Sequence, residues 1–270
     1  MPIAYEISGV DRGGPTLVLI HGWNCDRRYW AQAAERLAEH FRVVALDLGG
    51  HGESGTDRAD WSIASFGEDV ASVVRDQNLR RVVLVGHSMG GPVALDAAAR
   101  LPGRVIGVIG VDTFHAVDDP PPADLEDRLE PFRRDLPTAL ATLDPIFFAP
   151  STDPALADWI RRDMAAAPPR VSTPALRSLV RYDEFAALAT LDVPAAAINA
   201  DIQRTNVDAL RRARPGFEVV IVEDAGHFLM MEKPDEFARE LRGVITGWTS
   251  IASSAAAAPV SGPLPAASTQ

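Results

Sequence analysis

Short apolar runs alternate with amphipathic helical runs along most of this chain. We predict strands at Thr16 to Ile20, Arg42 to Leu46, Arg81 to Val85, Val105 to Val111, Pro194 to Ile198 and Glu218 to Val222, with Ala4 to Ile7 as an antiparallel edge. After Ser62, a residue type that caps helices, Phe66, Val70 and Val73 recur at helical spacing. This alternation is typical of an α/β fold with a mostly parallel central sheet and helices on both faces.

The alternation stops between residues 114 and 190. No strand pattern occurs there, and we predict short helices at Leu125 to Leu136, Pro154 to Ala166 and Pro174 to Leu188. A helical insertion of this kind is expected to lie over the sheet as a lid, inserted between strands 6 and 7. The predicted organisation is a core at 1–113, a lid at 114–190, a second core part at 191–248 and a disordered Ala/Ser/Pro-rich tail at 249–270.

Composition and charge narrow the possible partners. A chain of 270 residues can bury a full core as one α/β domain. Its net charge of −11, without a concentrated basic patch, disfavours nucleic acid and anionic membranes. We see no secretory signal and no apolar run near the roughly 20 residues of a membrane span. One cysteine, Cys25, cannot form an internal disulfide, so we expect a cytoplasmic protein. Oligomeric state is not readable from the sequence.

The segment Gly86-His87-Ser88-Met89-Gly90 carries the clearest chemical signal. It lies between an apolar run, Val82 to Val85, and an alanine-rich helical stretch. A serine on a tight turn from strand to helix adopts strained backbone angles, and glycines two positions away on either side leave room for the turn. The pattern therefore predicts a nucleophile elbow that exposes the Ser88 hydroxyl above the sheet.

A serine hydroxyl needs a base, and His227 is the best placed of the six histidines. It follows the last predicted strand in Gly226-His227-Phe228, so we expect it over the carboxyl edge of the sheet. His87 adjoins the nucleophile and is expected to pack beneath it. His115 lies at the entrance to the lid and could line the site.

These motifs resemble those of the α/β-hydrolase superfamily, in its serine ester hydrolase branch. The resemblance covers about residues 4–248. Besides Ser88 and His227 it rests on His21-Gly22-Trp23 and on the turn from Asp47 to Ser54. It implies an oxyanion hole formed by the backbone N–H groups of Trp23 and Met89, which would bind the charge that a carbonyl oxygen gains during attack.

The catalytic acid departs from the commoner pattern of the superfamily. Gln203 stands where most relatives carry the acid, and an amide cannot stabilise an imidazolium by charge. Two carboxylates could replace it. Asp112 ends the strand Val105 to Val111, a position that a minority of similar hydrolases use. Asp201 lies two residues short of the usual place. We favour Asp112 and keep Asp201 as the alternative.

The predicted function is hydrolysis of a small to medium carboxylic ester, through an acyl-enzyme on Ser88. Alternatives on the same triad are carbon-carbon bond hydrolysis, lactone opening and cofactor-free perhydrolysis. A carbon-carbon hydrolase would need a cation for its substrate carboxylate, for which Arg177 or Arg181 could serve. An alternative of another class is a ligand-binding, receptor-like protein with little turnover. The expected partner is a small-molecule substrate, and no cofactor or metal is implied.

Overall fold

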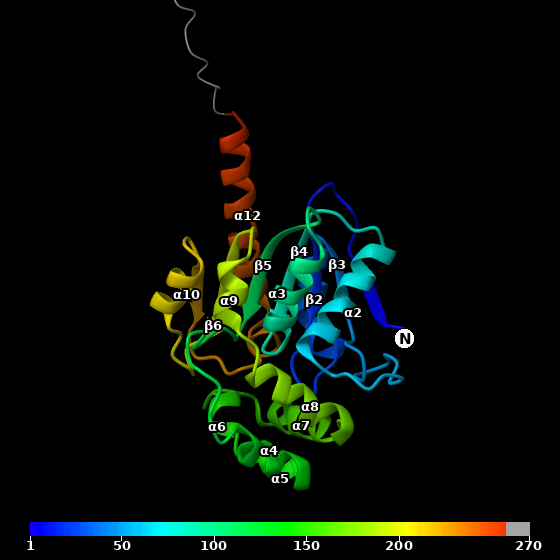
Figure 1. Cartoon of the computed structure of the whole chain (residues 1–270). Helices are drawn as coiled ribbons and strands as arrows, with labels where there is room; N and C mark the ends of the chain where they lie inside the picture. The colour runs from blue at the N-terminus through cyan, green and yellow to red at the C-terminus, as the bar shows by residue number, and fades with distance from the viewer. Residues whose placement is uncertain (258–270) are drawn as a thin grey trace, which may run out of the picture.

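A seven-stranded sheet in the order β1-β3-β2-β4-β5-β6-β7 forms the centre of the molecule (Figure 1). The computed structural model describes residues 1–257, with only the backbone of 249–257. The strands are β1 (Tyr5–Ser8), β2 (Thr16–Ile20), β3 (Arg42–Leu46), β4 (Val82–His87), β5 (Val105–Val111), β6 (Ala195–Ala200) and β7 (Glu218–Val222). All pair in parallel except β1, which is antiparallel to β3. The predicted α/β fold is confirmed.

Helices cover both faces of this sheet. Those of the core are η1 (Arg27–Trp30), α1 (Ala31–Ala38), α2 (Ile63–Asp76), α3 (Gly90–Arg100), α10 (Val207–Ala213), α11 (Leu229–Glu232) and α12 (Pro234–Ala257). α2 and α3 lie side by side on one face, and α1 packs against α12 on the other (Figure 1). The strands between them are rich in buried β-branched residues, as expected for a parallel sheet covered on both faces.

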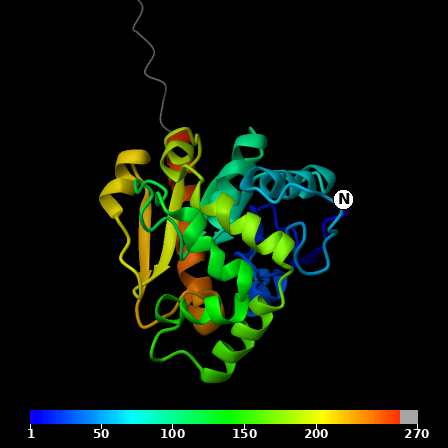
Figure 2. The ribbon, with the colours of Figure 1, turned by 60° about the horizontal axis from the view of Figure 1, so that its bottom comes forward.

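Six helices between β5 and β6 form the insertion. Figure 2 shows the first five lying across one end of the sheet, whereas the last packs against α3 and α10 beside the sheet. The six are α4 (Leu125–Arg134), α5 (Leu136–Ala141), α6 (Asp144–Phe147), α7 (Pro154–Ala165), α8 (Pro169–Val180) and α9 (Glu184–Ala189). The predicted place between strands 6 and 7 is wrong, because only five strands precede the insertion in the described chain. We call this insertion, residues 114–190, the lid.

Local backbone chemistry sets the helix ends in the lid. Asp135, whose side chain accepts from the Thr138 N–H, interrupts the single helix predicted from 125 to 136. α8 begins at Pro169 rather than at Pro174. A proline is well tolerated at the first helical position, which Pro169 takes, whereas Pro174 lies within the helix and lacks the N–H of a normal helical turn.

The last core helix is longer than the sequence pattern predicts. α12 runs to Ala257, so the tail boundary predicted at residue 249 is wrong for 249–257. Alanine is the strongest helix former, and it lets the helix continue through a stretch without charge or periodicity. The remainder of the predicted tail, 258–270, lies outside the described residues. Within residues 1–257, no helix has the length and apolarity needed to cross a bilayer.

Candidate active site

Ser88 lies on a strained turn between β4 and α3. Its φ of 51° falls in the left-handed region, which a serine adopts only at a cost. The flanking glycines are required by space: a Cβ on Gly86 would lie 2.0 Å from the Gly90 carbonyl oxygen, and one on Gly90 would lie 2.4 Å from that of Ile20. The turn therefore has the backbone of the predicted elbow.

Strand register brings the candidate acid to the same edge of the sheet as Ser88. β4 and β5 pair with His87 opposite Val111, and the Ser88 N–H donates to the Val111 carbonyl at 2.9 Å. One residue on, the Asp112 N–H donates to the carbonyl of Ile198 on β6 at 3.0 Å. The carboxyl ends of parallel strands meet at one edge of the sheet. Ser88, which follows β4, and Asp112, which follows β5, therefore lie at the same edge.

Asp112 and His227 form a buried pair. Nδ1 of His227 donates to Oδ2 of Asp112 at 2.5 Å, and the Asp112 carboxylate has no solvent exposure. Its other oxygen, Oδ1, accepts from the Ala200 N–H at 2.9 Å. Burial opposes ionisation of this carboxyl, but the nearby rings of His115 and His227 outweigh it and hold the pKa of Asp112 well below its usual range. The acid is therefore ionised at neutral pH.

Asp201 lies elsewhere. It is exposed, and its Oδ1 is 3.5 Å from the Ala225 N–H in the loop after β7. Gln203 in the same loop is half-buried. Of the two carboxylates that the sequence leaves open, the structure brings Asp112 to His227 and leaves Asp201 in a surface turn.

The ring of His227 is held between the elbow and the lid. The backbone carbonyl of His227 accepts from Nε2 of His87, the residue before Ser88, at 2.9 Å. On the lid side, the His227 N–H donates to the Phe147 carbonyl at 2.8 Å, and the Phe147 ring stacks on the imidazole with centroids 4.9 Å apart. Since the hydrogen on Nδ1 is donated to Asp112, Nε2 is the nitrogen of His227 that is left to act as a base.

The hydroxyl of Ser88 makes no hydrogen bond to the rest of the described chain. The backbone N–H groups of Trp23 and Met89 likewise donate to no other group within residues 1–257. The loop that holds Trp23 lies against the elbow, because a Cβ on Gly22 would meet the Ser88 Cβ at 3.2 Å. Met89 immediately precedes α3, whose helix dipole favours negative charge at this end.

His21 fixes the loop that carries Trp23. The Leu48 N–H donates to Nε2 of His21 at 2.9 Å, so the ring hydrogen lies on Nδ1, which donates to the Gly22 carbonyl at 2.8 Å. Burial lowers the pKa of His21 to about 4, and the ring is therefore neutral. This pair of hydrogen bonds determines where the chain turns before Trp23.

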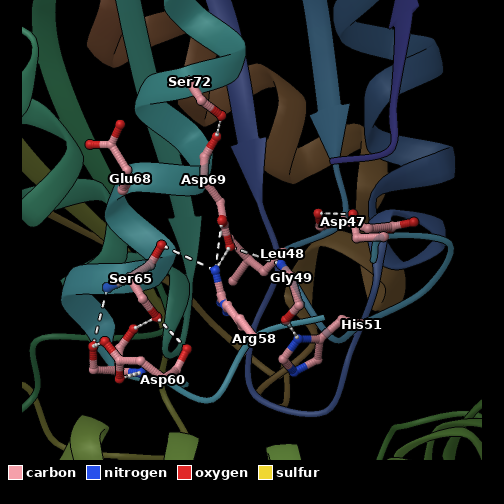
Figure 3. A network of polar contacts seen from close by, with 12 residues as sticks. Asp47, Leu48, Gly49, His51, Arg58, Asp60, Ser65, Glu68, Asp69 and Ser72 are labelled. Carbon is pink, nitrogen blue, oxygen red and sulfur yellow. Dashed lines mark hydrogen bonds and ion pairs between the residues drawn. The ribbon is translucent and has the colours of Figure 1, made fainter. Parts of the chain in front are cut away.

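A buried ion pair supports the neighbouring glycine-rich turn, as Figure 3 shows. Asp69 on α2 accepts from Nη1 of Arg58 at 2.7 Å and from the Gly49 N–H at 2.9 Å. The Arg58 guanidinium also lies 4.7 Å from the ring centroid of Trp61. Burial raises the pKa of the Asp69 carboxyl, which makes the pairing with Arg58 necessary to keep it charged.

The lid contacts the loop that holds Trp23 as well as His227. The Trp23 ring meets Phe132 of α4 edge to face, with centroids 5.6 Å apart, and its Nε1 donates to the Ser172 carbonyl in α8 at 2.7 Å. These partners were not predictable from the sequence individually, because apolar residues recur throughout the lid. Arg177 and Arg181 do not reach this region as free cations: both pair with Glu126 on the lid surface.

Comparisons with known proteins identify the fold family. The model of the alpha/beta hydrolase family matches residues 17–240. The chain superposes on a thermophilic esterase from Thermogutta terrifontis with a TM-score of 0.79 and 28% identity, covering 91% of this chain and 93% of that one. An enol-lactonase from Burkholderia xenovorans LB400 gives a TM-score of 0.77 at 25% identity, covering 90% and 96%.

An uncharacterized protein of Mycobacterium tuberculosis is 38% identical over 116 residues. The match covers 43% of this chain and 33% of that protein, so the chain spans only about a third of that relative's length. The family match spans both core parts and the lid between them, and it includes the elbow, Asp112 and His227. The chain belongs to the alpha/beta hydrolase family.

Proposed function

We propose that the protein is a serine hydrolase that cleaves carboxylic esters through an acyl-enzyme. The observation that carries this proposal is the 2.5 Å hydrogen bond between His227 and a buried, ionised Asp112, beside an elbow that presents Ser88. An ionised carboxylate in this place orients the imidazole and stabilises the imidazolium formed during catalysis.

In the proposed mechanism, Ser88 Oγ attacks the ester carbonyl and its proton passes to Nε2 of His227. The N–H groups of Trp23 and Met89 bind the resulting oxyanion. The tetrahedral intermediate then expels the alcohol, which takes the proton from His227. Water, deprotonated by the same nitrogen, attacks the acyl-enzyme; Ser88 Oγ then leaves and takes the proton back from His227, which releases the carboxylic acid.

The contacts made by the lid favour an uncharged or weakly charged substrate. Phe132 and Phe147 contact Trp23 and His227, so the groups nearest the proposed reaction centre are aromatic. A carbon-carbon hydrolase would need a cation there, but Arg177 and Arg181 are already paired with Glu126. A lactone is a cyclic ester and would follow the same steps. A relative named as an enol-lactonase makes lactones the second class to test.

The test does not depend on the identity of the natural substrate. The protein is treated with a fluorophosphonate, and intact mass is measured for the wild type, Ser88→Ala and the matched control Ser151→Ala on an exposed turn. We expect one adduct on the wild type and on the control, and none on Ser88→Ala. Hydrolysis of short p-nitrophenyl esters and lactones is then measured on the same three proteins. A wild type that gains no adduct and cleaves neither class would overturn the proposal in favour of the receptor-like alternative.

A further inference from the structure

A second histidine lies beside the carboxylate of Asp112. While Oδ2 accepts from His227, Oδ1 lies 3.5 Å from Nε2 of His115. This separation exceeds that of a normal hydrogen bond, yet Nε2 has no other polar partner in the described chain. The His115 side chain is only 17% exposed. A serine-histidine-aspartate triad does not require a second histidine beside the carboxylate, so the position of His115 needs its own explanation.

Asn199 fixes the direction of the hydrogen bonds behind His115. Its amide oxygen accepts from the Thr113 N–H at 3.2 Å, and its amide nitrogen donates to the Thr113 carbonyl at 3.0 Å. These two backbone groups permit only one orientation of the amide. The second hydrogen of the same nitrogen is therefore donated to Oγ1 of Thr205, at 2.8 Å.

This direction favours one tautomer of His115. Thr205 Oγ1 can accept a second hydrogen bond, but its own hydrogen is satisfied within the described chain only when it has an acceptor. Among the described residues that acceptor is Nδ1 of His115, at 3.2 Å. When Nδ1 accepts, the ring hydrogen of the neutral imidazole lies on Nε2, the nitrogen that faces Asp112.

We propose that His115 is a positioning residue of the catalytic site: held by Thr205 and Asn199, it directs an N–H at Oδ1 of Asp112 and so keeps Oδ2 directed at His227. The inference rests on the serine-hydrolase function proposed above. His115 acts on the reaction only through Asp112.

The loop after β6 thereby holds the acid in place instead of supplying it. The resemblance to the superfamily places the acid in this loop, where Gln203 stands. Here the loop donates to an acid that ends another strand: the Ala200 N–H bonds Oδ1 of Asp112 directly, and Asn199 acts through Thr205 and His115.

Charged groups around His115 come from two sides. Asp112 faces it from the end of β5, and Glu184 at the start of α9 is near enough to interact with it electrostatically. His227 lies beyond the Asp112 carboxylate. A pH profile measured on variants of His115 therefore reports on these groups together.

The first measurement compares His115→Phe, which keeps a ring but removes both nitrogens, with His115→Gln, whose amide can still donate toward Asp112. On p-nitrophenyl acetate we expect His115→Phe to lower kcat about 10- to 100-fold, because a hydrogen bond to a charged group is lost, with KM changed less than about twofold. We expect His115→Gln to recover most of the rate. Fluorophosphonate labelling of Ser88 should slow in the same order.

The pH profile separates this role from simple packing. Removing a donor from Asp112 leaves more negative charge for His227, so the acid limb of kcat/KM should move to higher pH in His115→Phe. Thr205→Val removes the hydroxyl that selects the tautomer and should lower kcat by a smaller factor. Matched controls are His40→Phe and Thr190→Val, which alter exposed residues that make none of the contacts described for His115, Thr205 or Asn199.

An activity-independent measurement completes the test. The ¹⁵N shifts of the His115 ring, assigned by comparison with His115→Phe, should show hydrogen on Nε2 in the wild type and a mixture of tautomers in Thr205→Val. Hydrogen on Nδ1 in the wild type, or a full rate and an unmoved acid limb in His115→Phe, would overturn the role of His115 while leaving the serine hydrolase intact. A wild type inert to the fluorophosphonate would overturn both proposals, whatever the tautomer.

Discussion

At the scale of single residues, two histidine rings keep the candidate acid charged. Asp112 is fully buried, and its oxygens face the Ala200 N–H and the rings of His115 and His227. The two rings favour the ionised carboxyl and lower its pKa despite burial. An amide in place of the carboxylate would keep the shape and lose the charge.

We therefore expect Asp112→Asn to lower kcat by about 10³- to 10⁴-fold, because the imidazolium of His227 would lose its counter-charge and the ring its correct tautomer. Steady-state hydrolysis of a p-nitrophenyl ester measures this loss. Asp201→Asn is the matched control and should stay within about twofold of the wild type. A large loss in Asp201→Asn together with a near-normal Asp112→Asn would reverse the assignment of the acid.

Glu184 shows the opposite behaviour of a carboxyl. Burial raises its pKa to about 7, although His115 opposes the shift. Between its ordinary pKa of 4.5 and about 7, the folded protein holds a proton that the unfolded chain has lost. The free energy of unfolding therefore falls as pH rises through this window and stays low above it.

Glu184→Gln removes this penalty. We expect the variant to gain about 1 to 2 kcal/mol over the wild type at pH 8, after allowing for the partial exposure of the side chain, and nothing at pH 4. Urea denaturation at the two pH values measures the difference. Glu35→Gln, on the exposed face of α1, is the control. An equal effect of Glu184→Gln at both pH values would contradict the raised pKa.

At the scale of elements, the lid helices are fastened to one another through a surface cluster. Glu126 of α4 pairs with Arg177 of α8 at 2.9 Å and with Arg181 at 3.2 Å, and Arg133 of its own helix also reaches it, at 2.6 Å. Three cations thus share one carboxylate. Exposed pairs of this kind contribute between about 0 and 1 kcal/mol each.

Arg177→Gln distinguishes this structural role from substrate binding. If Arg177 only joins α4 to α8, KM for a neutral ester and for a carboxylate-bearing ester should both stay within about twofold, with stability lowered by less than about 1 kcal/mol. Steady-state kinetics on the two substrates and a thermal melt provide the measurements. A rise in KM confined to the acidic substrate would instead place Arg177 in the binding pocket.

Strands were predictable here to a degree that lid helices were not. Buried parallel strands are short apolar runs bounded by turns, so β2, β3 and β5 coincide with their predicted ranges. The partly exposed edge strand β7 does so as well. A lid helix is defined by caps and prolines whose roles depend on neighbours. Pro169 begins α8 and Pro174 lies inside it, although a proline at either position could start a helix.

The site divides in the same way. Ser88 and His227 were predictable as candidates because their motifs are local in sequence. The choice between Asp112 and Asp201 was less predictable, because each residue comes directly after a strand. Only the packing of the loops decides which carboxylate meets the His227 ring. His115 and Asn199 lie 84 residues apart, and no local pattern joins them.

At the scale of the whole molecule, three neutral histidines are buried beneath the site. Burial lowers the pKa of His21 to about 4 and that of His51 and His87 to about 3. His21 and His51 lie with ring centroids 5.0 Å apart, and His87 lies 4.6 Å from His227. Their mutual repulsion on protonation adds to the cost of burying charge.

Acid should therefore unfold this protein at a higher pH than its carboxylates alone would require. Below the ordinary histidine pKa of 6.5 the unfolded chain binds protons that the folded one excludes, so the free energy of unfolding decreases as pH falls. Each buried histidine contributes up to about 1.4 kcal/mol per pH unit between pH 6 and 5. Glu184 has the opposite slope in this range and offsets one of the three.

His51→Asn tests this account, because asparagine can still donate to the Gly49 carbonyl, which His51 Nδ1 now bonds at 3.0 Å, but cannot be protonated. Urea denaturation at half-unit steps from pH 7 to 5 should give a slope shallower than that of the wild type by up to about 1.4 kcal/mol per unit. The exposed His40→Asn should leave the slope unchanged. Adding Glu184→Gln to the wild type should steepen it, since the offsetting carboxyl is then gone. Parallel slopes for wild type and His51→Asn would mean that His51 is protonated in the folded protein.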